Sequence, residues 1–168
     1  MITVFVSKEG YYICGDGIEA ALRCSPALDD HGNPIFHELH HTYKVMFLAM
    51  QVIAKKGKID GDVIVYNDTR IIDELNGNIS PFDDVCQKWR QVIRREVMPC
   101  IKSIVTFRKR AQDFIATKLA AADKLVTSQD RTALKALAEK SKHIEQAKTR
   151  STKARVLDKF KRMWKNDK

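Results

Sequence analysis

The segment DVIVYNDTRIIDELN, residues 62–76, constrains the fold of this chain most. Its first half is a continuous run of β-branched and aromatic residues, which is typical of a strand buried on both faces. Its second half, from Thr69, indicates a short helix that stops at Gly77. A strand buried on both faces needs helices on both sides of its sheet. The sequence therefore predicts a layered α/β domain with Asp68 at the tip of a central strand.

Short strands are expected before this segment. ITVFVS alternates as a half-buried strand does, YYICG resumes after the turn at Gly10, and EAALRCS is read as a continuation of that second strand. Turn formers collect at residues 29–34, and the following IFHELH is either a third strand or the approach to a helix. From Thr42, apolar residues recur at helical spacing until KKGK, which predicts an amphipathic helix.

Helices dominate the rest of the chain. Ser80 and Pro81 suit the cap and first residue of a helix, which Pro99 would end. SIVTF is then the last strand candidate, and no strand pattern follows Arg110. We expect a domain over residues 1–124 and a helical extension over residues 125–168.

The positive charge is concentrated in the C-terminal third. Residues 1–106 hold 12 Lys/Arg and 14 Asp/Glu, a net of −2, whereas residues 107–168 hold 18 and 7, a net of +11. A basic helical region favours a polyanionic partner, most simply nucleic acid. A solvated helical surface with surplus lysine is the alternative reading of the same residues.

The cysteines and the hydropathy pattern point to an intracellular protein. The four cysteines form no CxxC pair and no regular framework, which favours buried thiols in a reducing compartment such as the cytoplasm. The first residues alternate as a strand and do not resemble a signal peptide. No apolar run approaches the roughly 18 residues that a membrane span needs, so no membrane partner is expected.

This order of elements resembles the ribonuclease H-like superfamily: three antiparallel strands, a helix, a buried strand ending in Asp, helices, a last strand and a closing helix. VIVYNDTRIIDELNG is similar to the family's strand, acidic tip and helix. RAQDFIATKLA is similar to its closing motif R-x-x-N-x-x-A-D-x-L-A. The resemblance implies a five-stranded mixed sheet flanked by helices, of α/β class, over about residues 1–122.

The resemblance also implies two-metal phosphodiester hydrolysis, in which two Mg²⁺ ions about 4 Å apart are held by some four carboxylates. Aligned with the family, this chain offers Ser7 at the end of the first strand and Lys44 in the first helix. Asp68 is an intact match, and Thr117 stands where the family has its last Asp. An ammonium at Lys44 would repel the ions and is a candidate ion-pair partner of Asp68. We therefore expect a degenerate site, a pseudoenzyme without a cofactor, with Asp68 as a relic carboxylate.

A rearranged active site stays open as an alternative. Asp16 in YICGDGIE and Glu38 at the approach to the first helix could join Asp68 and Asp113 as ligands of Mg²⁺. The histidines of HELHH suggest a separate metal-binding site; they are His37, His40 and His41. No Asp, Glu or Cys at a familiar spacing completes that site.

Basic residues near the last strand and in the extension are the candidates for phosphate contact. They are Arg108, Lys109, Arg110, Lys153, Arg155, Lys159, Lys161, Arg162 and Lys165. The terminal helix also has an apolar face that suits self-docking, a protein partner or a homo-oligomer. That face consists of Val156, Phe160, Met163 and Trp164.

The sequence thus predicts a non-cleaving module that binds RNA, DNA or a nucleoprotein. Three other classes stay open: a metal-dependent nuclease with the rearranged carboxylates, an adaptor or inhibitor that uses the fold as a scaffold, and an oligomeric structural subunit.

Overall fold

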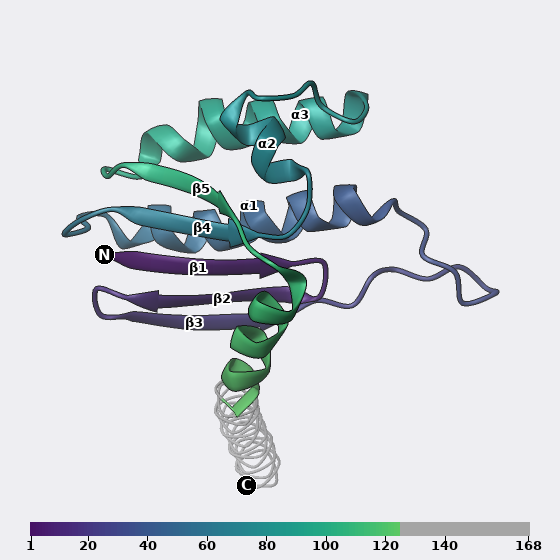
Figure 1. Cartoon of the computed structure of the whole chain (residues 1–168), viewed down its shortest axis with the longest axis horizontal. Coiled ribbons are helices and arrows are strands. Elements are labelled where there is room, and N and C mark those ends of the chain that lie inside the picture. Colours follow the sequence, from purple (N-terminus) through teal and green to yellow (C-terminus); the bar gives the residue numbers. More distant parts are fainter. Residues whose placement is uncertain (125–168) are drawn as a thin grey trace, which may run out of the picture. The chain divides into compact units, whose positions relative to one another are not determined.

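A five-stranded mixed sheet forms the centre of the described domain (Figure 1). The computed structural model describes residues 1–124. Strand order is β3-β2-β1-β4-β5, with β1, β2 and β3 antiparallel and β4 and β5 parallel to β1. The strands are β1 (Ile2–Ser7), β2 (Gly10–Gly15), β3 (Ile18–Arg23), β4 (Val63–Asn67) and β5 (Val105–Lys109). The predicted mixed sheet flanked by helices is confirmed.

Helices connect the parallel strands and cover the sheet. α1 connects β3 to β4, and four consecutive helical segments connect β4 to β5. The helices are α1 (Glu38–Lys56), α2 (Ile71–Asn76), α3 (Asp84–Val92), a π-helix (Ile93–Val97) and a 3₁₀ turn (Met98–Cys100). A further helix starts at residue 112 and continues to residue 124, the last described position. No helix within residues 1–124 is long and apolar enough to cross a membrane.

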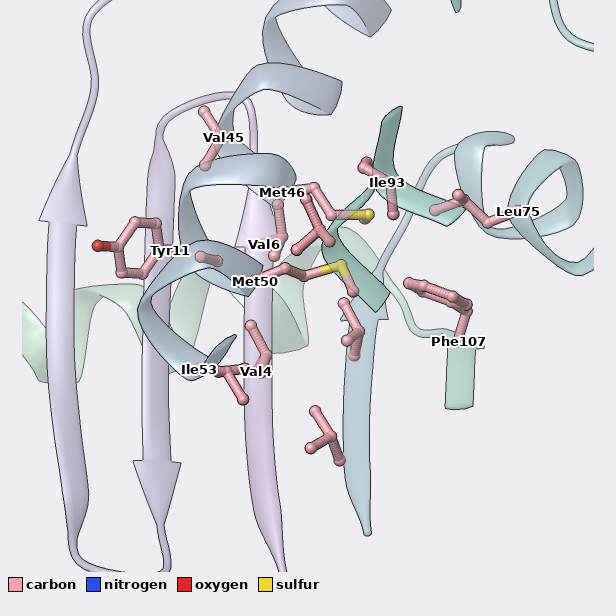
Figure 2. Packing of buried hydrophobic residues seen from close by; sticks show 14 of the residues in the cluster. Val4, Val6, Tyr11, Val45, Met46, Met50, Ile53, Leu75, Ile93 and Phe107 are labelled. Carbon is pink, nitrogen blue, oxygen red and sulfur yellow. The ribbon is translucent and has the colours of Figure 1, made fainter. Parts of the chain in front are cut away.

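The main core lies between α1 and the face of the sheet that carries the even-numbered residues of β1. Val4 and Val6 are fully buried there, because alternate side chains of a strand point to the same face. From α1, Met46, Met50 and Ile53 pack onto them at helical spacing (Figure 2). Full burial of each such side chain contributes about 1.5–3 kcal/mol. The amphipathic helix expected from the sequence is therefore confirmed, although it begins before Thr42.

A smaller apolar cluster occupies the opposite face. Phe5 of β1 points away from α1 and packs with Ile115 and Leu119 of the helix over residues 112–124. Both of these helix residues are buried, whereas most of their neighbours on that helix are exposed. This helix therefore covers the second face of the sheet at the end where β1 and β4 finish.

The third strand is an expectation that needs correction. The chain reverses at Gly15, Asp16 and Gly17, which all have positive φ (115°, 50° and 69°), so β3 pairs back onto β2 as a separate strand. IFHELH is not a strand: His37 caps α1 by accepting a hydrogen bond from the Leu39 N–H at Nδ1.

The helix after Gly77 also begins later than expected. Its cap is Asp83, whose side chain accepts a hydrogen bond from the Cys86 N–H at 2.8 Å, and not Ser80. Gly77 ends α2 in the left-handed conformation (φ 80°), as the sequence predicts.

Candidate functional site

The carboxyl ends of β1 and β4 meet at a polar tip that a buried amide holds in place. Asn67, the last residue of β4, is fully buried, and its Nδ2 donates to the Val6 carbonyl of β1 at 2.8 Å. Its Oδ1 accepts from the Thr69 backbone N–H at 2.9 Å. These bonds satisfy the buried amide and fix the turn, so Asp68 is held half-buried at the edge of the sheet.

Asp68 lines a small hollow of about 90 Å³. Residues directly after β1, the first residue of α1, the β4 tip and the helix over residues 112–124 all contribute to its wall. The lining residues are Ser7, Lys8, Glu9, Glu38, Asp68, Thr69, Gln112, Ile115, Ala116 and Leu119. Ser7 and Asp68 therefore line the same hollow.

Lys44 does not reach this hollow. It is exposed on α1 and lies near Cys24, where burial raises the pKa of the thiol and the Lys44 charge partly offsets that rise. Within residues 1–124 it forms no ion pair with Asp68. α1 begins at Glu38, six residues earlier, so the acidic first residue of the helix lines the hollow instead.

The helix over residues 112–124 presents different side chains from those that the sequence alignment suggested. Asp113 and Thr117 are exposed and do not line the hollow; the Thr117 hydroxyl donates to the Asp113 carbonyl at 2.8 Å. Gln112 and Ala116 face the hollow in their place. A shift of one residue turns a helical side chain by about 100°, which is enough to exchange an inward for an outward position.

Asp16 lies at the other end of the sheet. Thr3 pairs with Cys14 and Ser7 with Gly10, so Asp16 is near the start of β1 and Asp68 near its end, roughly 17 Å apart along the strand. The Asp16 carboxylate accepts a hydrogen bond from the Asp60 N–H at 3.0 Å. The rearranged set of Asp16, Glu38, Asp68 and Asp113 is therefore not assembled.

A pair of Mg²⁺ ions sets a requirement against which the side chains around Asp68 can be compared. Such a pair needs several carboxylate oxygens that converge on one point. Three acidic residues line the hollow, but Glu38 pairs with Lys8 at 3.4 Å and Glu9 with Arg23 at 3.8 Å. Within residues 1–124, no three carboxylate, thiol or imidazole ligand atoms gather around Asp68 closely enough to share an ion.

The rim of the hollow beside β5 is basic. Arg108, Lys109 and Arg110 are exposed, and the last two line an open depression of about 440 Å³ together with Asp68. Lys109 Nζ lies 3.3 Å from the Asp73 carboxylate. The Arg110 guanidinium stands 5.4 Å from the ring centre of Tyr66, an arrangement that holds the cation over the aromatic face.

An aromatic group adjoins Arg110. Phe5 stacks on Tyr12 and Tyr66 with ring centres 6.2 and 5.6 Å apart, and Phe114 approaches the Phe5 ring edge-on at 5.9 Å. Lys118 Nζ lies over Phe114 at 5.5 Å. This face of the sheet thus combines aromatic rings and cations, although Phe5 itself is buried.

Sequence reasoning missed a second basic hollow, on α3 and the π-helix. It measures about 650 Å³ and its wall carries three arginines. The lining residues are Ser80, Pro81, Gln87, Arg90, Gln91, Arg94 and Arg95. Arginines at i, i+4 and i+5, opposite the apolar stripe of the same helix, were the available signal.

The remaining basic candidates, from Lys153 to Lys165, and the apolar face from Val156 to Trp164 lie outside the described residues. The four cysteines are not disulfide-bonded.

Comparison with solved structures gives a likeness of fold. No family model and no curated protein matches this sequence. The crystal structure of ribonuclease H1 from the halophilic archaeon Halobacterium salinarum NRC-1 is similar, with 14% sequence identity and a TM-score of 0.47. The likeness covers 64% of this chain and 75% of that one, and it concerns the fold alone.

Proposed function

We propose that this chain binds nucleic acid, RNA or DNA, or a nucleoprotein, without cleaving it. The observation that carries the proposal is the charge arrangement at the β4 tip. Asp68 has basic residues beside it, Lys109 and Arg110, and two of the three acidic residues of its hollow are paired with cations. Such an arrangement suits contact with phosphate and opposes the gathering of divalent ions.

The basic residues are placed to follow a phosphate backbone. Lys109, the last residue of β5, and Arg110, directly after it, both line the depression beside Asp68, and Arg108 precedes them. The Arg110 guanidinium lies over the rings of Tyr66 and Phe114. The arginines of the hollow on α3 add a second cationic surface. Contacts of this kind position a nucleic acid but do not read its sequence.

Binding is tested with the full chain by fluorescence anisotropy, using labelled RNA–DNA hybrid, single-stranded RNA and duplex DNA over a series of salt concentrations. We expect the Lys109→Ala/Arg110→Ala double variant to weaken binding and to reduce the slope of log K against log salt by about 1–2, because each lost phosphate contact removes nearly one unit. Lys55→Ala/Lys58→Ala is the matched control, because both lysines are exposed at the far end of α1. Equal losses in both double variants would contradict a specific surface.

Cleavage is tested on the same substrates with Mg²⁺ or Mn²⁺. We expect no turnover in the wild type. We also expect Asp68→Asn to bind at least as tightly as the wild type, because the substitution removes one negative charge from the surface that contacts phosphate. Metal-dependent cleavage that disappears in Asp68→Asn would overturn the non-catalytic part of the proposal. A catalytically inactive chain that fails to bind any of the three substrates would overturn the binding part.

An adaptor function is the second candidate, because a group of large apolar side chains is exposed. Leu28, Ile35 and Phe36, before α1, are 54%, 57% and 59% exposed, and Phe82, before α3, is 48% exposed. Apolar groups that stay in contact with water favour a protein partner. Salt-insensitive capture of a single protein, lost in Phe36→Ser and retained in Arg108→Ala, would support this function over nucleic-acid binding.

A further inference from the structure

Three potential metal ligands meet between the first turns of α1 and α3. His40 Nε2 lies 2.6 Å from Asp83 Oδ2, and Cys86 Sγ belongs to the same group, in which all ligand atoms lie within 4.8 Å of one another. This is the only such group of three among residues 1–124. Sequence reasoning found no partner for the histidines, because Asp83 lies 43 residues from His40 along the chain.

Local structure fixes two of the three ligands before any ion arrives. Asp83 caps α3 through Oδ1, which accepts from the Cys86 N–H at 2.8 Å, so its other oxygen, Oδ2, is aimed at His40. Cys86 lies in the first turn of α3 and is fully buried. Asp83 and Cys86 thus stand at i and i+3 across the start of one nine-residue helix, facing the imidazole of another helix.

We propose that His40, Asp83 and Cys86 bind one zinc-like transition-metal ion, with water at a fourth position. Zn²⁺ takes imidazole nitrogen, carboxylate oxygen and thiolate sulfur together, in tetrahedral geometry. Mg²⁺ and Ca²⁺ do not suit this set, because they require mainly oxygen ligands and higher coordination numbers. The site is distinct from the hollow around Asp68, and the proposal does not rest on nucleic-acid binding.

The distances between the three ligand atoms allow an ion to bind after small movements of the side chains. Metal–ligand distances of about 2.0–2.3 Å put neighbouring ligand atoms of a tetrahedral ion roughly 3.3–3.8 Å apart. The His40–Asp83 contact of 2.6 Å therefore has to open by roughly 1 Å, which exchanges one hydrogen bond for two metal bonds. The cap of α3 remains intact during this change, because it uses Oδ1.

His37 forms a wall of the site and is not the fourth ligand. Its Nδ1 accepts a hydrogen bond from the Leu39 N–H, so its Nε2 carries the proton in the neutral ring and offers no lone pair. Its ring stacks on Phe82 with centres 4.8 Å apart. Water is therefore the simplest fourth ligand, and the ion would join the start of α1 to the start of α3.

The test uses the full chain, reduced and stripped of metal by a chelator, titrated with Zn²⁺ by calorimetry and with Co²⁺ by absorption spectroscopy. We expect one equivalent to bind and Co²⁺ to give a thiolate-to-metal charge-transfer band. Cys86→Ser should abolish the band. His40→Gln and Asp83→Asn should lower the Zn²⁺ affinity at least about 100-fold, since loss of an outer partner alone costs 10–100-fold.

Cys100→Ser and His31→Gln are the matched controls, because both residues are exposed, and they should bind as the wild type does. Circular dichroism checks that each variant folds. His40→Gln and Asp83→Asn keep the test decisive if the buried Cys86→Ser does not fold, because asparagine still caps a helix. Absence of stoichiometric binding, a cobalt band that survives in a folded Cys86→Ser, or wild-type affinity in both other variants would each overturn the proposal.

Discussion

A buried hydrogen bond between Tyr43 and Glu74 provides a quantitative test of how α1 is fastened to α2. The Tyr43 hydroxyl donates to Glu74 Oε2 at 2.8 Å, and both residues are fully buried. The other oxygen, Oε1, accepts from Arg70 Nε at 2.8 Å and from the Phe82 N–H at 3.1 Å. Burial, and then the nearby Glu74 carboxylate, raise the pKa of Tyr43, so its phenol stays protonated and able to donate.

Tyr43→Phe keeps the ring and removes only the hydroxyl, which leaves Glu74 Oε2 buried without its donor. A hydrogen bond to a charged group contributes about 1.5–3 kcal/mol, so we expect the free energy of unfolding to fall by about 2 kcal/mol. For a chain of this length, 1 kcal/mol corresponds to roughly 2–4 °C, so the melting temperature should fall by about 4–8 °C. Urea denaturation followed by circular dichroism measures the first quantity and calorimetry the second.

Tyr11→Phe is the matched control. Tyr11 is 7% exposed, and its hydroxyl makes no hydrogen bond within residues 1–124 and points away from the core cluster (Figure 2). Its loss should change the free energy of unfolding by less than about 0.5 kcal/mol. In a Glu74→Gln background, Tyr43→Phe should cost only about 1 kcal/mol, because the acceptor is then uncharged. A Tyr43→Phe variant as stable as Tyr11→Phe would refute the reasoning.

Two further predictions concern the β-hairpins and their surroundings. The hydrogen bond from the Asp60 N–H holds the pKa of Asp16 below its ordinary value, so this carboxylate adds stability that is full above about pH 5 and is lost as the pH falls through the lowered pKa. The urea midpoint of the wild type should therefore drop more steeply between about pH 5 and 2.5 than that of Asp16→Asn. Parallel curves for the two proteins would exclude this role. Gly10→Ala should cost about 3 kcal/mol or more by thermal unfolding, since a Cβ there would lie 2.0 Å from the Leu22 carbonyl oxygen. Gly32→Ala, also at a positive φ (80°, against 149° at Gly10) but with open space around it, should cost only about 1–2 kcal/mol, and equal losses would show that the close contact at Gly10 adds nothing.

Continuous local patterns made much of the fold predictable. The unbroken apolar run of β4, the period of α1 and the stop at Gly77 each depend on neighbours within a few residues, so the sequence displays them directly. The separate strand β3 was missed because the reversal depends on the backbone conformation of Asp16, which lies between two glycines. Asp16 has a positive φ, a conformation that residues with a β-carbon adopt rarely.

The candidate site was harder to predict, because its geometry depends on rotation and on distant contacts. Asp68 was placed correctly, since it directly follows a recognisable strand. The motif in the closing helix pointed to Asp113 and Thr117, whereas Gln112 and Ala116 are the residues of that stretch that line the hollow. The approach of Asp83 to His40 follows from the packing of α1 against α3, which no local pattern encodes.

The parallel pairing of β4 with β5 has a consequence for synthesis of the chain. β4 ends at Asn67, but its outer neighbour begins only at Val105, after all the helical segments between them. During translation, one row of amide and carbonyl groups of β4 therefore has no partner strand until β5 is made. Val63 and Val65, which are buried in the folded chain, belong to this strand. A nascent or truncated chain that stops before Val105 therefore exposes an unpaired strand edge, which is a template for pairing with another chain.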